Sequence, residues 1–201
     1  MPMKPDREYR AMTLAVSEAE KRIQSEFYIE GLATTFNQPY ILYEDGENKY
    51  MEVVDRNALD GADVSDVILQ YDHEGRVFAR QSNGTLGIEP TEKGLFIFAD
   101  LSKSVGAKEL FEEIRSGLIT KMSWAFTVAD DEYDRNTHTR TIKRVKKVYD
   151  VSAVSIPANG GTEISARSYL NGLIEAEKRE TLARLELAKA KYNYYFGGMK
   201  V

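Results

Sequence analysis

The stretch Phe27-Tyr-Ile-Glu-Gly-Leu-Ala-Thr-Thr-Phe36 points to the class of fold, because it is rich in aromatic and β-branched residues and ends at Asn37-Gln-Pro39. Such a run predicts a short strand followed by a turn. Similar runs follow at residues 49–54, 67–71, 75–81, 86–90, 94–101, 120–128, 139–145 and 148–156. Many short strands with turns between them indicate a barrel or a sandwich.

Two segments have helical patterning instead. Residues 104–117 begin with a serine suited to an N-cap and end with a glycine. Their apolar residues share one helical face: Ala107, Leu110, Phe111 and Ile114. Residues 171–196 predict an amphipathic helix, with charged residues on the other faces. Its apolar positions are spaced by about three and four: Leu182, Leu185, Ala188, Tyr192 and Tyr195. The predicted fold class is therefore α+β, mainly β.

Composition excludes several kinds of function. The chain has 201 residues, of which 42% are hydrophobic, and this is enough for one ordinary domain with a core. With 27 Lys and Arg against 32 Asp and Glu, the net charge of −5 offers no basic field for nucleic acid. No cysteine is present, which removes disulfides and thiolate chemistry and suits a reducing cytoplasm.

Hydropathy indicates a soluble chain that is not exported. The first residues lack the apolar core of a signal peptide, and no run approaches the roughly 18 apolar residues of a membrane span. We therefore expect neither a membrane nor a nucleic-acid partner. Three regions are expected: a polar arm or loosely held helix at 1–24, a β domain at 25–167 and a helical tail at 168–201.

Three polar residues lie inside or beside apolar runs. His73 follows Leu69-Gln-Tyr-Asp, Ser123 lies within Ile119-Thr-Lys-Met-Ser-Trp-Ala-Phe126, and Asp150 lies within Val148-Tyr-Asp-Val-Ser. Together they can supply a base, a nucleophile and a group that orients the base. Each also has a plainer reading: a small residue beside aromatics, a strand-end histidine, and a salt-bridged carboxylate. His138, the second histidine, lies in a polar stretch and suits a base less well.

The order of these segments resembles a known family. The carriers are Phe27 to Asn37, the Asp72-His73 pair, Gly84-Thr-Leu-Gly with Glu92-Lys-Gly-Leu95, Ile114 to Phe126 and Asp150-Val-Ser-Ala-Val-Ser-Ile-Pro-Ala-Asn159. Over residues 27–167 the chain is similar to the prohead (capsid maturation) serine proteases of tailed bacteriophages. Five segments matching in order make the resemblance specific, whereas one alone would be weak.

The resemblance implies a fold and roles for individual residues. The family is related in fold to the herpesvirus assembly proteases, whose core is a small β-barrel wrapped by helices. By resemblance His73 is the base, Ser123 the nucleophile and Asp150 the orienting acid. The turn after Asp150 suggests an oxyanion hole at the backbone of Asn159 and Gly160, where closely spaced N–H groups are available.

The chain departs from the family pattern at two positions. Trp124 follows the serine where smaller side chains or phenylalanine are common, and this could narrow a substrate pocket. Asp150 stands where glutamate is frequent, which shortens the reach to His73. Alternative orienting acids therefore stay open: Asp72, Glu74 and Asp130.

The resemblance also implies a function. It is a serine endopeptidase, inside the procapsid in the host cytoplasm, that cleaves scaffolding protein or the scaffold-like arm of the major capsid protein and then itself. A processing site is expected near residues 166–170, and the tail helix is expected to bind scaffold, to self-associate or to pack on its own domain. The alternative is a catalytically inactive capsid-assembly module that binds coat protein through the tail. No cofactor or metal is expected, since the chain has no phosphate-binding glycine loop and only two, widely separated histidines.

Overall fold

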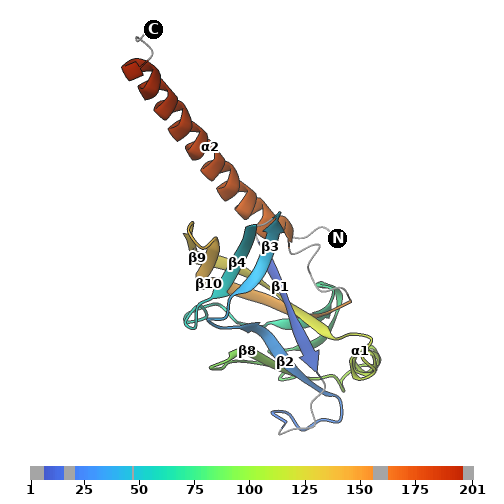
Figure 1. Cartoon of the computed structure of the whole chain (residues 1–201). Helices are drawn as coiled ribbons and strands as arrows, with labels where there is room; N and C mark the ends of the chain where they lie inside the picture. The colour runs from blue at the N-terminus through green and yellow to red at the C-terminus, as the bar shows by residue number, and fades with distance from the viewer. Residues whose placement is uncertain (1–6, 16–20, 47, 156–162, 197–201) are drawn as a thin grey trace. The chain divides into compact units, whose positions relative to one another are not determined.

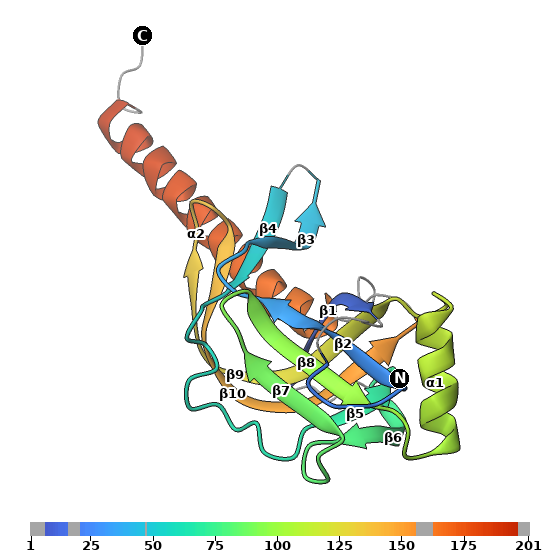
Figure 2. The same cartoon turned by 90° about the horizontal axis from the view of Figure 1, so that it is seen from below.

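The computed structural model describes residues 7–15, 21–46, 48–155 and 163–196. Contacts divide the chain into two units, residues 1–165 and 166–201. Most of the elements are labelled in Figure 1, and β5, β6 and β7 are labelled in Figure 2. They are β1 (Glu8–Ala15), β2 (Tyr28–Thr35), β3 (Tyr40–Asp45), β4 (Asn48–Val54), β5 (Ile68–Tyr71), β6 (Glu74–Arg80), β7 (Leu86–Pro90), β8 (Gly94–Asp100), α1 (Val105–Arg115), β9 (Lys121–Asp134), β10 (Thr139–Val154) and α2 (Glu163–Phe196).

The strands form one mixed sheet in the order β3-β4-β10-β9-β1-β2-β8-β7, with β5 paired to β10 and β6 paired to β5. Only β4 and β5 run parallel to β10, and the other neighbours are antiparallel. The prediction of a mainly β protein with two helices is confirmed for the described residues. The expected closed barrel is wrong for these residues, because the order ends at β3 and β7 and these two strands do not pair.

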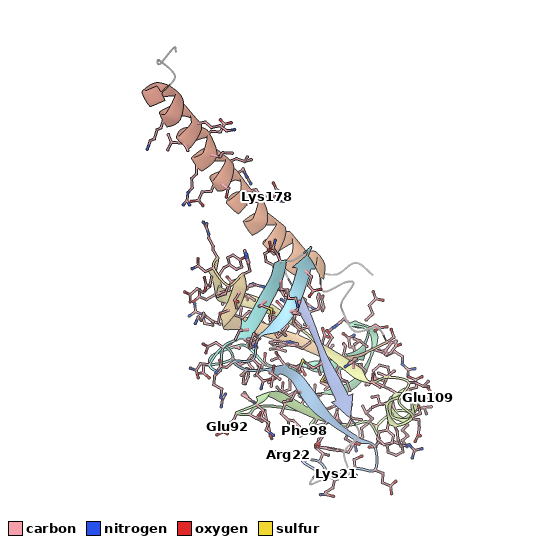
Figure 3. The ribbon with its side chains drawn as sticks, viewed as in Figure 1. Lys21, Arg22, Glu92, Phe98, Glu109 and Lys178 are labelled. Carbon is pink, nitrogen blue, oxygen red and sulfur yellow. The ribbon has the colours of Figure 1, made fainter. Side chains whose placement is uncertain are left out.

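The sheet curls around the apolar core. In Figure 2, β2, β8 and β7 lie in front of β9 and β10. A continuous cluster of buried side chains joins the two sides, with Ile29 and Ile97 from one and Trp124 from the other. At the outer strands, Gly87 of β7 leaves room for the ring of Phe98, labelled in Figure 3, which a Cβ atom on Gly87 would overlap.

The N-terminal segment differs from the expected arm or loose helix, because residues 8–15 form β1 between β9 and β2. The charged residues of this segment are the reason that its sequence predicted a solvent-exposed arm. Arg10 is buried, and its guanidinium donates to both oxygens of Glu52 at 2.6 and 2.7 Å. Arg140 of β10 donates to Glu8 at 2.7 and 2.9 Å. The charges of β1 are thus paired inside the protein across long sequence separations.

The buried charge cluster consists of Glu8, Arg10, Glu52 and Arg140, and it shifts the pKa of Arg10 and of the neighbouring Tyr40. Arg10 is desolvated, but the Glu52 carboxylate outweighs that cost and holds the pKa of Arg10 well above its ordinary range. Burial, together with the Glu52 charge, raises the pKa of the Tyr40 hydroxyl well above its usual value. The ion pairs of the cluster tie β1 to β4 and β10.

The two helices are of different kinds. Helix α1 confirms the predicted segment: the Ser104 hydroxyl accepts from the Ala107 N–H at 3.1 Å, and the apolar face packs into the core. Helix α2 begins before the expected residue 171, and its described side chains from 172 to 191 are exposed. Exposed leucines include Leu187, which lies off the predicted apolar face. Among the described residues, no helix is both long and apolar enough to cross a membrane.

The hairpin of β9 and β10 positions the polar residues singled out from the sequence. Side chains alternate along a strand, so each strand of the hairpin has a core face and an opposite face. The core face carries Met122, Trp124, Phe126, Val151 and Ala153. Ser123 and Ser152 are paired in register, as are Ala125 and Asp150, and these four alternate with the core residues. Ser123, Asp150 and Ser152 therefore share the opposite face.

Candidate active site

His73 lies in a tight two-residue turn between β5 and β6. Tyr71 pairs with Glu74 across this hairpin, so Asp72 and His73 are the turn residues. Both have left-handed backbone conformations, with φ of 47° and 60°. Positive φ at both central residues is typical of a type I′ turn, which usually carries Asn or Gly. Asp tolerates this conformation better than most residues, whereas for His73 it costs about 1–2 kcal/mol, so the surroundings must hold it.

The end of β10 holds this turn in place. The Asp72 N–H donates to the Ala153 carbonyl at 2.9 Å. The Asp72 carboxylate accepts from the Ser155 N–H at 3.0 Å and from the Ser155 hydroxyl at 2.9 Å. The His73 N–H donates to Ser152 Oγ at 3.2 Å. Parallel pairing of β5 with β10 thus brings the histidine turn onto residues 152–155.

The imidazole of His73 is paired with Asp150. The Nδ1 atom lies 2.5 Å from Asp150 Oδ1, and the two side chains are 12% and 4% exposed. An ionised carboxylate can only accept, so this contact suits the neutral tautomer with the proton on Nδ1, in which Nε2 keeps its lone pair. The ring of Tyr9 on β1 meets the imidazole edge to face, with ring centroids 4.6 Å apart. The imidazole of His73 is therefore oriented by a carboxylate and packed against an aromatic ring.

Ser123 lies on the strand next to this pair. It is directly opposite Ser152 on β10 and Ala11 on β1, and it is 0% exposed. Ser123 Oγ and His73 Nε2 are both buried and make no hydrogen bond with any described residue. The Ser123–His73 hydrogen bond is thus not formed in this structure. Hydrogen bonds between catalytic groups are often long before substrate binds. Buried polar atoms normally have hydrogen-bond partners, so Ser123 Oγ and His73 Nε2 are exceptions.

Hydrogen bonding distinguishes the two facing serines. The Ser152 hydroxyl donates to Asp150 Oδ1 at 2.9 Å and accepts from the His73 N–H. The Ser152 hydroxyl proton is therefore donated to a carboxylate. The hydroxyl of Ser123 makes no hydrogen bond with any described residue, so Ser123 is the serine whose proton a base could take.

The other candidates from the sequence lie elsewhere. Asp72 is engaged with Ser155, Glu74 is exposed, and Asp130 is exposed and opposite Arg144, so Asp150 is the carboxylate that contacts His73. His138 lies against the ring of Tyr50 instead, and its Nδ1 is hydrogen-bonded to the Tyr133 hydroxyl at 3.1 Å. The proposed oxyanion residues, Asn159 and Gly160, lie outside the described residues.

Sequence reasoning missed Ser152, Ser155 and Tyr9. A signal for Ser152 was present, because a residue two positions from Asp150 on a strand lies on the same face. For metals, no group of three or more potential ligands is placed to hold an ion within the described ranges.

Comparison with known proteins identifies the family. The model of the caudovirus prohead serine proteases matches residues 13–174. The prohead protease of Escherichia phage T5 is 29% identical over 59% of this chain, and that of Enterobacteria phage HK97 is 30% identical over 41%. These matches span 54% and 37% of the two relatives, so the chain covers about half or less of their length.

A solved structure, that of the capsid assembly protease of bacteriophage T4, is also similar. The match has a TM-score of 0.47 and 14% identity, and it covers 76% of this chain and 99% of that one. The family assignment rests on the family model, which spans most of the β unit and the start of α2. The chain belongs to the caudovirus prohead serine protease family.

Proposed function

We propose that this chain is a serine endopeptidase of phage head maturation, with Ser123 as nucleophile, His73 as general base and Asp150 as the orienting carboxylate. The observation that carries the proposal is the part-buried His73–Asp150 hydrogen bond, which in the neutral imidazole leaves Nε2 as an acceptor, while the Ser123 hydroxyl makes no hydrogen bond with any described residue. Family membership supports the reaction class.

In this mechanism His73 Nε2 takes the Ser123 proton as Oγ attacks the peptide carbonyl carbon. The same nitrogen then returns the proton to the leaving amine, and water repeats the sequence on the acyl-enzyme. Asp150 keeps Nδ1 protonated and stabilises the imidazolium that forms. The oxyanion is assigned to the backbone N–H groups of Asn159 and Gly160, which would have to point at it.

Because Ser123 is buried, a substrate must first gain access to its hydroxyl. A peptide carbonyl must come within about 3–3.5 Å of the nucleophile, but Ser123 has no exposed surface. The groups that cover this face must therefore move before cleavage. A protease with a covered nucleophile suits a role in which cleavage waits for assembly.

The proposed substrates are the scaffolding protein or the scaffold-like arm of the major capsid protein, and the chain itself near residues 166–170. The proposed place of action is the interior of the prohead in the host cytoplasm, and self-association through α2 is proposed as well. The described side chains of α2 are exposed, so this helix is available to bind a partner.

Co-expression with the cognate capsid and scaffolding proteins tests this function. The wild-type chain should shorten one of them, and Ser123→Ala should abolish the shortening while the circular dichroism spectrum stays unchanged. Ser116→Ala, which alters an exposed serine at the end of α1, is the matched control and should cleave normally. Full cleavage by Ser123→Ala would remove Ser123 from the mechanism.

The second candidate is an inactive capsid-assembly module, favoured by the complete burial of Ser123. It predicts that capsid and scaffolding proteins keep their full length, and that coat binding is lost when residues 169–201 are deleted. The same co-expression separates the two functions.

A further inference from the structure

Ser152 occupies the centre of the hydrogen bonds around His73. Its side chain is 0% exposed. The hydroxyl donates to Asp150 Oδ1 at 2.9 Å, the same oxygen that His73 Nδ1 approaches at 2.5 Å. It accepts from the His73 backbone N–H at 3.2 Å. One buried hydroxyl therefore contacts both partners of the pair.

These two contacts constrain different degrees of freedom. The bond to Asp150 restrains the carboxylate, whose terminal torsion is otherwise broad. The bond from the His73 N–H restrains a turn whose left-handed backbone needs outside support. An alanine here would leave a buried carboxylate oxygen with one donor fewer and the His73 N–H without this acceptor.

We infer that Ser152 is a positioning residue, whose hydroxyl locks the Asp150 carboxylate and the His73 turn in one arrangement and so aims His73 Nε2. The catalytic meaning of this role rests on the proposed peptidase function. The geometric part does not, because the proton between His73 Nδ1 and Asp150 Oδ1 is observable without substrate.

Proton NMR of the full-length, ¹⁵N-labelled chain tests the geometry. The Hδ1 proton of His73 should give a downfield signal that exchanges slowly with water, and His138→Gln assigns it because the chain has only two histidines. Ser152→Ala should move this signal upfield or broaden it beyond detection. Ser25→Ala is the matched control, since Ser25 donates to Asp100 Oδ1 at 2.5 Å on another strand, and it should leave the signal unchanged.

If Ser152→Ala does not fold, Ser152→Cys replaces it, because a thiol is close in shape but a weak donor. It should perturb the same signal, whereas Ser152→Thr, which keeps a hydroxyl, should restore it. An unchanged Hδ1 signal in the folded alanine or cysteine variant would overturn the inference. So would an equal change in Ser25→Ala, because the effect would then be general.

Co-expression with capsid protein supplies the catalytic readout. Ser152→Ala should lower the cleavage rate roughly 10- to 100-fold, the range expected for a lost hydrogen bond to a charged group or a misplaced reacting atom. A changed Hδ1 signal with undiminished cleavage would refute the catalytic part. If the wild-type chain cleaves nothing, the proposed function fails, and the NMR comparison still decides whether Ser152 holds the pair.

Discussion

His73 Nδ1 lies 2.5 Å from Asp150 Oδ1 although 77 positions separate the two residues. The approach follows from strand pairing. Asp150 is opposite Ile68 and Ala153 is opposite Tyr71 in the parallel ladder of β5 and β10. The chain then turns at Asp72 and His73, which folds the imidazole back toward Asp150. A backbone arrangement, rather than a long flexible side chain, therefore brings the imidazole and the carboxylate together.

Asp150→Asn should lower cleavage of capsid or scaffolding protein by about 10⁴-fold, the loss known for the same change in the trypsin-type triad. The amide can donate to Nδ1, which favours the wrong imidazole tautomer. Cleavage rates and circular dichroism measure activity and fold separately. Asp130→Asn changes an exposed carboxylate away from His73 and serves as control. Equal activity of the two variants would contradict the assignment.

Asp72→Ala should destabilise the histidine turn, because it removes the acceptor of both Ser155 hydrogen bonds. We expect the free energy of unfolding in urea to fall by about 1–2 kcal/mol, together with slower cleavage. Asp72→Asn keeps one acceptor oxygen and should lose less. A stability and a cleavage rate that both match the wild type would show that the turn needs no such support.

Removing one member of the buried charge cluster should be far more costly than removing a surface ion pair. Glu52→Gln removes one of the two carboxylates that pair with the buried Arg10, and we expect a loss of about 3–5 kcal/mol. Arg80→Met breaks the Arg80–Asp66 pair, both of whose side chains are over 40% exposed, and should cost at most about 1 kcal/mol. Urea unfolding of both variants makes the comparison, and similar losses would contradict the account.

Stability should also fall in acid because of Glu8. Burial opposes ionisation of Glu8, but the Arg140 hydrogen bond and the charges of Arg10 and Arg140 outweigh it, so the pKa of Glu8 lies below its ordinary 4.5. A lowered pKa means that the stabilisation is complete above 4.5 and is lost as the pH falls through the folded-state value.

The contribution of Glu8 to the melting temperature should therefore begin to fall below about pH 4.5 and be lost at lower pH. Glu8→Gln should make the decline of the melting temperature in acid shallower. Differential scanning calorimetry across this range measures both slopes. Glu92→Gln alters an exposed carboxyl group outside the cluster and controls for general acid effects. Parallel curves for the wild type and Glu8→Gln would show that Glu8 is not protected by its arginines.

Local patterns in the sequence predicted most strands and α1, because alternation and capping depend on neighbouring residues. They could not predict β1, whose charges find partners 42 and 132 positions away. Nor could they decide whether the sheet closes, since this depends on which distant edges pair. The choice of His73, Ser123 and Asp150 needed the family resemblance. The placement of Ser123 and Asp150 on one face of β9 and β10 depends on the register, which a single sequence does not contain.

Covalent labelling of the chain measures whether His73 activates the Ser123 hydroxyl as a nucleophile. Diisopropyl fluorophosphate is a small reagent, and it can react with Ser123 once the groups that cover this residue move, because Ser123 has no exposed surface in this structure. Mass spectrometry of the full-length chain should find one adduct, on the peptide containing Ser123, and His73→Gln should nearly abolish it. An adduct on another serine, no adduct in a chain that cleaves capsid protein, or undiminished labelling of His73→Gln would contradict the account.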